Sequence, residues 1–329
     1  MKNITMNKIK IFAAVVVAMF ASASLFAQDV NTVKAKYNEA AAKISAKDFN
    51  AAITLLDEAV NLGLETEGAE ETVDAAQKLL PVCYFQSGLG LAKAKQLDAA
   101  LEKFTKAAEL GELYGDAKSA RNANTMIARV YTMKGADAFN SKDFATAASI
   151  FANGYAANPN DTKLALNLAM SYCEMGDLVK GGEVYKQILS LTHSKYDADK
   201  ATAKEKFTNY LLAAASTNAT ESKFDEALVY TNEIIALDSL SAVGNKLLVQ
   251  LYNSKQDYAK VAELAGNAAA LQATPEEQSD LYYMQGAALS NSDKLPEAIE
   301  AYKKVTAGNN VANAAEQIKA LQAVIASKK

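Results

Sequence analysis

Hydrophobic residues recur along most of this chain at spacings of three, four and seven, with polar residues between them. Such spacing places the apolar side chains on one face of an α-helix. Long runs of alternating apolar and polar residues, which would indicate half-exposed strands, are missing. The pattern therefore predicts an all-α chain of many short amphipathic helices.

A short motif recurs within this pattern: an aromatic residue or leucine, followed three residues later by alanine, glycine or valine. It occurs seven times, and we call its first residue the anchor: Phe49, Leu97, Phe144, Leu178, Phe224, Tyr258 and Leu295. Successive anchors are 48, 47, 34, 46, 34 and 37 residues apart. A fixed period of this size indicates stacked structural repeats. We interpret the three large gaps as 34-residue units joined by longer connections.

Each anchor lies in a wider pattern of small and bulky residues. Nine residues before it stands a small residue in six units, with Val249 as the exception: Ala40, Gly88, Gly135, Ala169, Ala215 and Gly286. Seven residues after it stands a bulky residue in five units: Leu56, Phe104, Phe151, Tyr185 and Tyr302. A small residue is needed where two helices cross closely. Each unit is therefore predicted to be a helical hairpin, and hairpins must stack because one alone cannot bury both faces.

This spacing resembles the tetratricopeptide repeat, most clearly from Tyr131 to Pro159. The resemblance implies a right-handed α-solenoid of about seven helical hairpins over residues 28–308. A terminal helix over 311–327, with Ile318, Leu321, Val324 and Ile325 on one side, is expected to cap the last hairpin as residues 309–329.

Two prolines mark helix boundaries in this scheme. Thr274-Pro275-Glu276-Glu277 has the form of a capping box and predicts the start of a helix. Pro81 lies inside an apparently helical stretch from Glu70 to Leu91, where proline removes a backbone hydrogen bond. We expect a kink or break there.

The first 27 residues differ from the repeats. Lys8 and Lys10 precede an apolar stretch from Ile11 to Phe20, and small residues follow. This order is typical of a secretory signal peptide, with cleavage after Ala27 or, as second choice, after Ala23. The short basic start and the Phe-Ala-Gln ending resemble signals of Gram-negative bacteria, so the expected location is the periplasm. An uncleaved membrane anchor is the alternative, although the segment from Ile11 to Phe26 has 16 residues and falls short of the roughly 20 of a spanning helix.

Composition narrows the range of partners. The formal charge is −4, and residues 1–27 contain three lysines and no acid, so the remainder carries −7. An acidic body gives no electrostatic reason to expect nucleic acid as a partner. Cys83 and Cys173 fall in units that are not adjacent, so we expect two buried thiols and not a disulfide.

Candidates for catalysis are few. His193 is the one histidine, and without a cysteine cluster it cannot form a familiar zinc site. No orienting partner for a general-base histidine can be named. Ser87-Gly88-Leu89-Gly90 lies within a predicted helix and not after a strand, so it is not a phosphate loop. We predict no catalytic, cofactor or metal residues and no enzymatic activity.

In the family that the repeats resemble, first helices line a concave groove that binds protein. Carried onto the matching positions here, the resemblance implies a partner-binding groove with these residues: Val82, Phe85, Leu89, Lys93, Arg129, Thr132, Phe139, Asn140, Leu166, Met170, Lys246, Gln250 and Tyr283. The alternative is that the long connections fold back and bury Phe85, Leu166 and Met170. Lys246 has no basic or amide partners in adjacent units, so the family's clamp for a C-terminal carboxylate is not expected.

These inferences lead to one functional hypothesis and two alternatives. The leading hypothesis is a periplasmic scaffold or adaptor that binds a protein or peptide of unidentified sequence. The first alternative is a membrane-anchored structural or assembly component of the envelope. An enzyme with an unfamiliar helical active site is the second.

The signal-peptide hypothesis makes a prediction about the exported protein. Its intact mass and N-terminal sequence are expected to correspond to a chain that starts at Gln28, or at Ser24 for the second cleavage site. A membrane-bound chain that retains residues 1–27 would contradict this and favour the anchored component.

Overall fold

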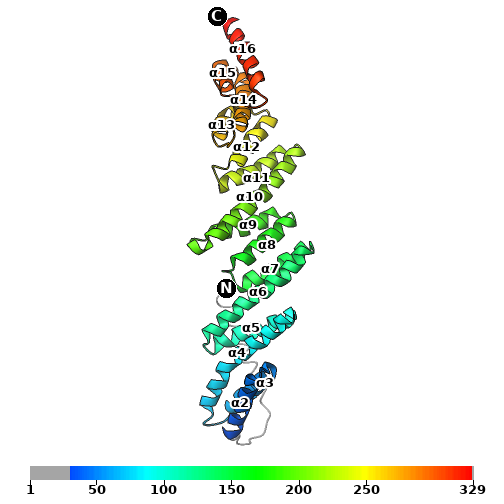
Figure 1. The fold of residues 1–329 in the computed structure, drawn as a ribbon, viewed down its shortest axis with the longest axis vertical. Helices are drawn as coiled ribbons and strands as arrows, with labels where there is room; N and C mark the ends of the chain where they lie inside the picture. The colour runs from blue at the N-terminus through cyan, green and yellow to red at the C-terminus, as the bar shows by residue number, and fades with distance from the viewer. Residues whose placement is uncertain (1–29, 328–329) are drawn as a thin grey trace. The chain divides into compact units, whose positions relative to one another are not determined.

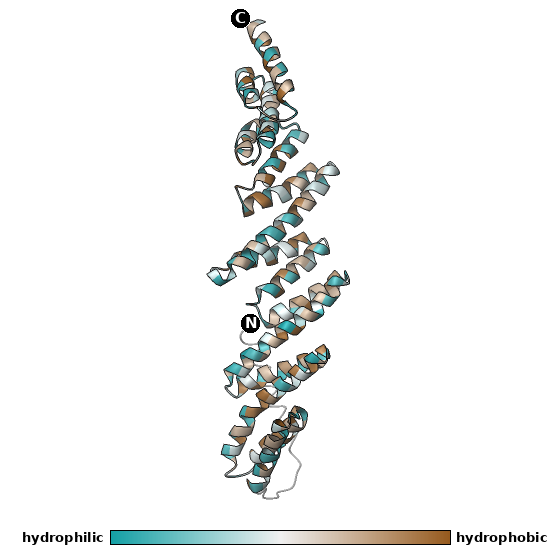
Figure 2. Cartoon of the chain, in the orientation of Figure 1, coloured by the Kyte–Doolittle hydropathy of each residue, from teal (hydrophilic) through white to brown (hydrophobic). Residues whose placement is uncertain are grey.

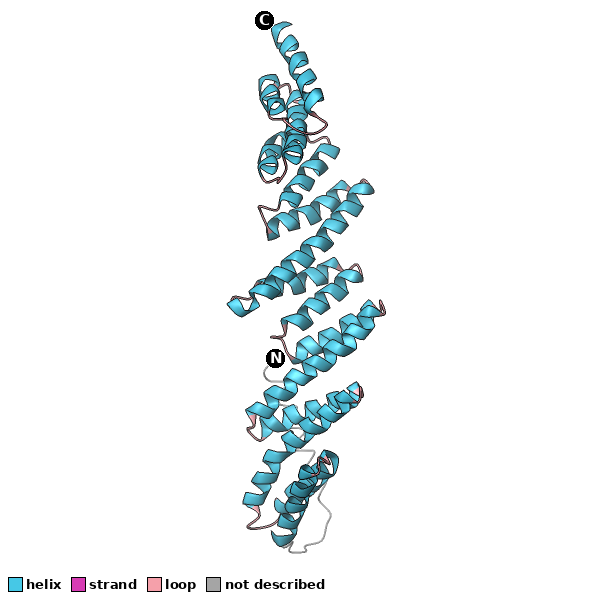
Figure 3. Cartoon of the chain, viewed as in Figure 1, coloured by secondary structure: helices cyan, strands magenta, loops and turns pink. Residues whose placement is uncertain are grey.

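The computed structural model describes residues 30–327, and every regular element there is a helix (Figure 3). The expected signal peptide and the last two residues lie outside these described residues. Hydrophilic and hydrophobic residues are interspersed along each helix, as the sequence pattern requires (Figure 2). The predicted all-α class is confirmed.

The helices form seven consecutive pairs followed by one single helix (Figure 1). The pairs in chain order are α2 (Val30–Ser45) with α3 (Phe49–Gly63), α4 (Glu70–Lys93) with α5 (Leu97–Leu113), α6 (Ala117–Asn140) with α7 (Phe144–Ala157), α8 (Thr162–Glu174) with α9 (Leu178–Leu189), α10 (Asp197–Thr220) with α11 (Phe224–Leu237), α12 (Ala242–Ser254) with α13 (Tyr258–Ala270), and α14 (Pro275–Asn291) with α15 (Leu295–Lys303). The single helix α16 (Val311–Ser327) follows, and a 3₁₀ turn (Ser194–Tyr196) precedes α10.

All seven anchors are the first residue of a second helix. Just before each anchor the chain turns through one residue of positive φ, such as Lys47 at 61° and Lys142 at 61°. Asp48 and Asp143 then cap the helices, because their carboxylates accept hydrogen bonds from the N–H groups of Ala51 and Thr146. The recurring motif is therefore the turn and N-cap of a helical hairpin.

The small and bulky positions meet inside the hairpins. A Cβ added to Gly88 would lie 2.8 Å from the Phe104 ring, and one added to Gly286 would lie 2.7 Å from Tyr302. Phe104 is fully buried. In the sixth hairpin the sizes are exchanged: Val249 stands on the first helix and Ala265 on the second, and both are fully buried. The expected close crossing of the two helices is confirmed. The departure at Val249 is matched by the small Ala265 on the facing helix, so the combined side-chain volume at this crossing is conserved.

The prediction of three longer connections is wrong. The additional residues lengthen the first helices: α4, α6 and α10 have 24 residues each, whereas α8 and α12 have 13. The added turns have buried residues of their own, for example Ala203 and Phe207 in α10. The added segments are thus helical packing elements and not loops that could fold over a groove.

Pro81 does not break α4, so of the predicted kink or break the break is wrong. The helix runs from Glu70 to Lys93, and Pro81 is buried inside it. Thr274 does cap α14: its hydroxyl accepts a hydrogen bond from the Glu277 N–H at 3.3 Å. In α16, Leu321 is buried and Ile318 and Ile325 are partly buried, as expected. The prediction that Val324 also lies on the packed side is wrong, because Val324 is 42% exposed.

Two compact units divide the described chain. Unit 1 ends at Met133 and unit 2 begins at Lys134, so the division falls within α6. In unit 1, α2 to α5 pack in sequence, and two apolar clusters form around Leu56 and Phe104. In unit 2, α7 contacts α8, and each second helix from α9 onward contacts both the helix before it and the helix after it, with α15 contacting α16. Stacking of this kind leaves the outer face of each first helix free within its unit.

Two glycines in α4 provide a matched test of the close crossing. Gly88→Ala is expected to lower the free energy of unfolding by about 1–3 kcal/mol, because the new Cβ overlaps the Phe104 ring. Gly90→Ala is expected to leave stability unchanged or raise it by about 0.5–1 kcal/mol, because nothing lies within 4 Å of its Cβ position. Urea denaturation followed by circular dichroism measures both. Equal effects of the two substitutions would contradict the packing.

Candidate functional site

The predicted groove residues on α4 lie on a partly exposed, partly apolar strip. Val82 is 38% exposed and Lys93 is exposed. Phe85 and Leu89 are half-buried and pack against the cluster around Phe104, with the two phenylalanine ring centroids 5.6 Å apart. These two residues support the hairpin and also contribute to its outer face.

The residues predicted on α6 divide in the same way. Arg129 and Asn140 are exposed. Thr132 is half-buried, and its hydroxyl donates to the Ala128 carbonyl at 2.9 Å. Phe139 is half-buried and packs edge-on against the anchor Phe144, with ring centroids 5.1 Å apart. Arg129 and Asn140 are therefore the residues of this set that can meet a partner without rearrangement.

On α8 the predicted site is largely interior. Leu166 is only 9% exposed, so it belongs to the packed core and offers little surface. Met170, four residues later, is half-buried. The prediction that Leu166 contacts a partner is therefore wrong, because Leu166 packs in the core. No long connection covers it, so the alternative explanation for its burial is wrong as well.

On α12 and α14 the predicted residues are polar or aromatic, and two of the three already contact another side chain. The Lys246 ammonium lies 3.0 Å from the Glu277 carboxylate, and this hydrogen bond holds the pKa of Glu277 below its usual value. Gln250 is half-buried. Tyr283 is half-buried and inclined against Tyr302, with ring centroids 5.4 Å apart.

A hollow of about 400 Å³ in unit 2 is lined in part by Lys246 and Gln250 of α12. We call it the α12 hollow. Its residues come from α10, α12, the turn after α13, and α14: Leu212, Ser216, Ala242, Val243, Lys246, Leu247, Gln250, Leu271, Gln272, Ala273 and Glu277. The hollow brings together two of the thirteen predicted residues and excludes Met170 and Tyr283.

Gln272 fixes one wall of the hollow. Its side chain is 7% exposed, and its amide nitrogen donates to the carbonyls of Ala242 and Ala268 at 3.1 and 2.8 Å. These bonds hold the first residue of α12 against the end of α13. The Ser241 hydroxyl caps α12 by accepting from the Gly244 N–H at 3.2 Å. The start of α12 is therefore positioned by two independent side chains.

Sequence reasoning missed most of the apolar lining. Val243 stands 15 residues before its anchor, as Val82 does, and Leu212 stands 12 residues before its anchor, as Phe85 does. Applying the same positions to every unit would have found both. Leu271 and Gln272 lie after the end of α13, where the repeat pattern carries no information about side-chain direction.

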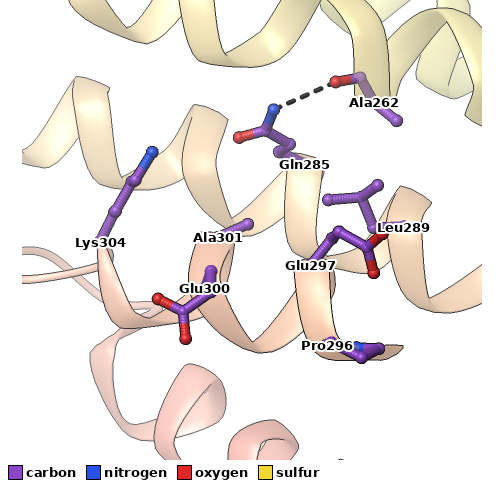
Figure 4. A pocket seen from close by; sticks show the side chains of 8 residues that line it. All are labelled: Ala262, Gln285, Leu289, Pro296, Glu297, Glu300, Ala301 and Lys304. Atoms are coloured by element: carbon purple, nitrogen blue, oxygen red, sulfur yellow. Dashed lines mark hydrogen bonds between the residues drawn. The ribbon is translucent and has the colours of Figure 1, made fainter. Parts of the chain in front are cut away.

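A second depression, of about 500 Å³, lies between α13, α14 and α15 (Figure 4). It contains Glu297, Glu300 and Lys304, and its Gln285 donates to the Ala262 carbonyl at 3.1 Å. This depression is larger but lined by helix-surface residues of both charges, and it lies on second-helix residues that the repeat pattern did not single out. We therefore retain the α12 hollow as the candidate site.

The reactive side chains of the described residues do not converge on either depression. Cys83 and Cys173 are free and buried, as predicted, and burial raises their pKa values to about 11 and about 12. His193 is exposed, and its Nδ1 accepts from the Lys195 N–H at 3.1 Å, which caps the 3₁₀ turn. Within residues 30–327 no group of three or more potential metal ligands occurs, and no helix is long and apolar enough to cross a membrane.

Comparison with known proteins yields structural matches only. No family profile matches this chain, and no curated protein sequence resembles it. The similar solved structures include the tetratricopeptide repeat domain of P58(IPK), with 12% identity over 91% of this chain and 99% of that one and a TM-score of 0.33. A tetratricopeptide repeat protein from Parabacteroides merdae has 14% identity over 89% and 99%, with a TM-score of 0.28. The TPR2AB domain of yeast Sti1, solved as a complex with pHSP90, has 16% identity over 74% and 96%, with a TM-score of 0.30.

The burial of Leu166 leads to a prediction that separates core from surface. Leu166→Ala is expected to lower the free energy of unfolding by about 2–5 kcal/mol, because it removes packed methyl groups and leaves a cavity. Met175→Ala, at a side chain that is 49% exposed, serves as the control and is expected to change stability little. Thermal denaturation compares the two. A Leu166→Ala protein as stable as the control would contradict the burial of Leu166.

Proposed function

We propose that this chain is a non-enzymatic scaffold of the cell envelope that binds a protein or extended peptide on the outer faces of its first helices. The observation that carries the proposal is the α12 hollow, in which three first helices contribute side chains to one concave site. Concave, partly apolar sites with a few polar groups are the usual form of binding sites.

The lining of the hollow favours an apolar side chain of a partner. Val243 is 47% exposed at its edge, and Leu240, in the preceding turn, is 72% exposed. Large apolar side chains held in water at one place are typical of contact sites. A partner that covers them would gain hydrophobic stabilisation roughly in proportion to the apolar area removed from water.

The polar groups around the hollow favour recognition over chemistry. Lys246 and Glu277 are paired with each other, so neither is held as a free acid or base. Gln272 donates its amide hydrogens to backbone carbonyls. Reactive sites require a nucleophile or base within reach of an orienting group, and the lining residues include no such pair.

The envelope location in this proposal is supported by the order of basic, apolar and small residues before Gln28. A membrane-anchored assembly component would use the same first-helix surface and differ in keeping residues 1–27. The partner's identity is not part of the proposal, since repeat surfaces diverge while their cores keep one spacing.

A charge placed at the hollow tests the proposal. The partner is first identified by cross-linking and mass spectrometry of the native envelope, and its Kd is then measured with purified protein. Val243→Asp is expected to weaken binding about tenfold or more, because the new carboxylate must be desolvated against apolar groups.

Val229→Asp on α11 is the matched control, because Val229 is 66% exposed and does not line the hollow. It is expected to bind normally. Unchanged affinity in a folded Val243→Asp protein would exclude the α12 hollow as the contact site.

A further inference from the structure

Charge is divided between the two helices of each hairpin in unit 1. The second helices are acidic: α3 has two acids and no base, and α5 has four acids and two lysines. The first helix α2 has three lysines and one glutamate. The part of α6 up to Met133 has three bases and no acid, whereas α4 has three acids from Glu70 to Asp74 and two lysines after them. Unit 1 is therefore acidic on its second helices, and its first helices are basic except at the start of α4.

The chain's two arginines both lie on this part of α6. Arg121 and Arg129 are exposed, and neither forms an ion pair with any described residue. The sulfur of Met126 lies 4.0 Å from the Arg129 guanidinium. An exposed guanidinium presents a rigid fork of donors that fits carboxylates in two-point contact, which an ammonium cannot do.

The cations alternate with apolar residues at equivalent positions. Fifteen residues before their anchors stand Lys34 on α2, Val82 on α4 and Arg129 on α6. Twelve residues before the same anchors stand Tyr37, Phe85 and Thr132 in the same order, followed on α4 by Leu89 and Lys93.

Equivalent positions on stacked hairpins face the same side, so these residues form one surface within unit 1. We call it the unit 1 strip. It contains three cations and no carboxylate. The last acid of α4 before the strip is Asp74, one helical turn before Lys78. It is already paired with Lys78 at 2.5 Å.

We propose that the unit 1 strip binds an acidic, partly apolar segment of a partner protein. This inference rests on the proposed function and names the chemistry of one ligand. Carboxylates of the segment contact Lys34, Lys93 and Arg129, and its apolar side chains cover Val82 and the exposed edges of Phe85 and Leu89. Charge complementarity selects the partner and steers its approach.

Three observations favour a protein segment over other anionic ligands. Unit 1 from residue 30 to 133 has fourteen acids and twelve bases, so its net charge of −2 gives a long polyanion such as nucleic acid no electrostatic attraction beyond the strip, whereas a short segment meets the three cations of the strip alone. The cations are distributed over three helices with apolar residues between them, as side chains along an extended peptide would require. The same positions in unit 2 hold Lys163, Asn209, Val243 and Asp280, which include a carboxylate and form no comparable surface.

The test uses fluorescence anisotropy with short synthetic peptides whose ends are acetylated and amidated. The first probe contains glutamate and leucine with serine spacers, and two matched probes replace every glutamate with glutamine or lysine. The full chain is expected to bind the glutamate probe about tenfold or more tightly than either matched probe. Binding is expected to weaken as salt rises from about 0.05 to about 0.5 M, because exposed charges are screened.

Two double variants with equal charge change locate the site. Lys34→Glu with Arg129→Glu is expected to weaken binding of the glutamate probe about tenfold or more. Lys206→Glu with Lys319→Glu is the control, since both lysines are exposed, unpaired among the described residues and outside the strip. Circular dichroism checks that each variant is folded, and Arg129→Gln replaces the first variant if it is not.

The inference is overturned if the glutamine probe binds as tightly as the glutamate probe, or if both double variants bind the glutamate probe like the parent chain. Tighter binding of a single-stranded oligonucleotide would also overturn it. None of these results affects the proposed function, which depends on whether Val243→Asp weakens the native partner. A chain that fails the peptide test and still binds that partner through the α12 hollow would refute the strip alone.

Discussion

Five of the seven described hairpins depend on a close crossing between a small residue and a bulky one. Gly88 admits the ring of Phe104, and Gly286 admits that of Tyr302, at distances that no additional methyl group would tolerate. Dense packing makes such contacts sensitive to a single methylene. Because the crossing fixes the rotation of the first helix, it also decides which of that helix's residues face outward. The proposed binding surface is in this sense a product of the core.

This dependence explains why the surface can vary freely while the core cannot. The same outward position is Lys34 in the first hairpin, Val82 in the second and Arg129 in the third. None of these side chains contributes to the crossing, so substitution there changes the surface without changing the fold. The exchange of Val249 and Ala265 shows the opposite case: a larger residue on one helix is matched by a smaller one on its partner. The outward position and the crossing positions of a repeat can therefore be substituted separately.

The two units offer two kinds of surface. In unit 2 a short first helix, α12, together with the ion pair between Lys246 and Glu277, leaves a neutral hollow with apolar lining. In unit 1 the first helices carry unpaired cations beside exposed apolar side chains.

The amino-acid sequence alone determined the repeat, the hairpins and the starting residue of each second helix, because these follow from local periodicity and turn chemistry. All seven anchors begin a helix for that reason. The lengths of α4, α6 and α10 were also encoded, by apolar residues such as Ala203 and Phe207 in the added turns of α10, but a gap between anchors does not by itself distinguish helix from loop. Tertiary structure alone decided that Leu166 is interior and that Leu271 and Gln272 line the hollow, because burial and cavity lining depend on neighbours distant in sequence. A spacing rule specifies which face of a helix a residue occupies, whereas only the packed neighbours decide whether that face meets protein or water.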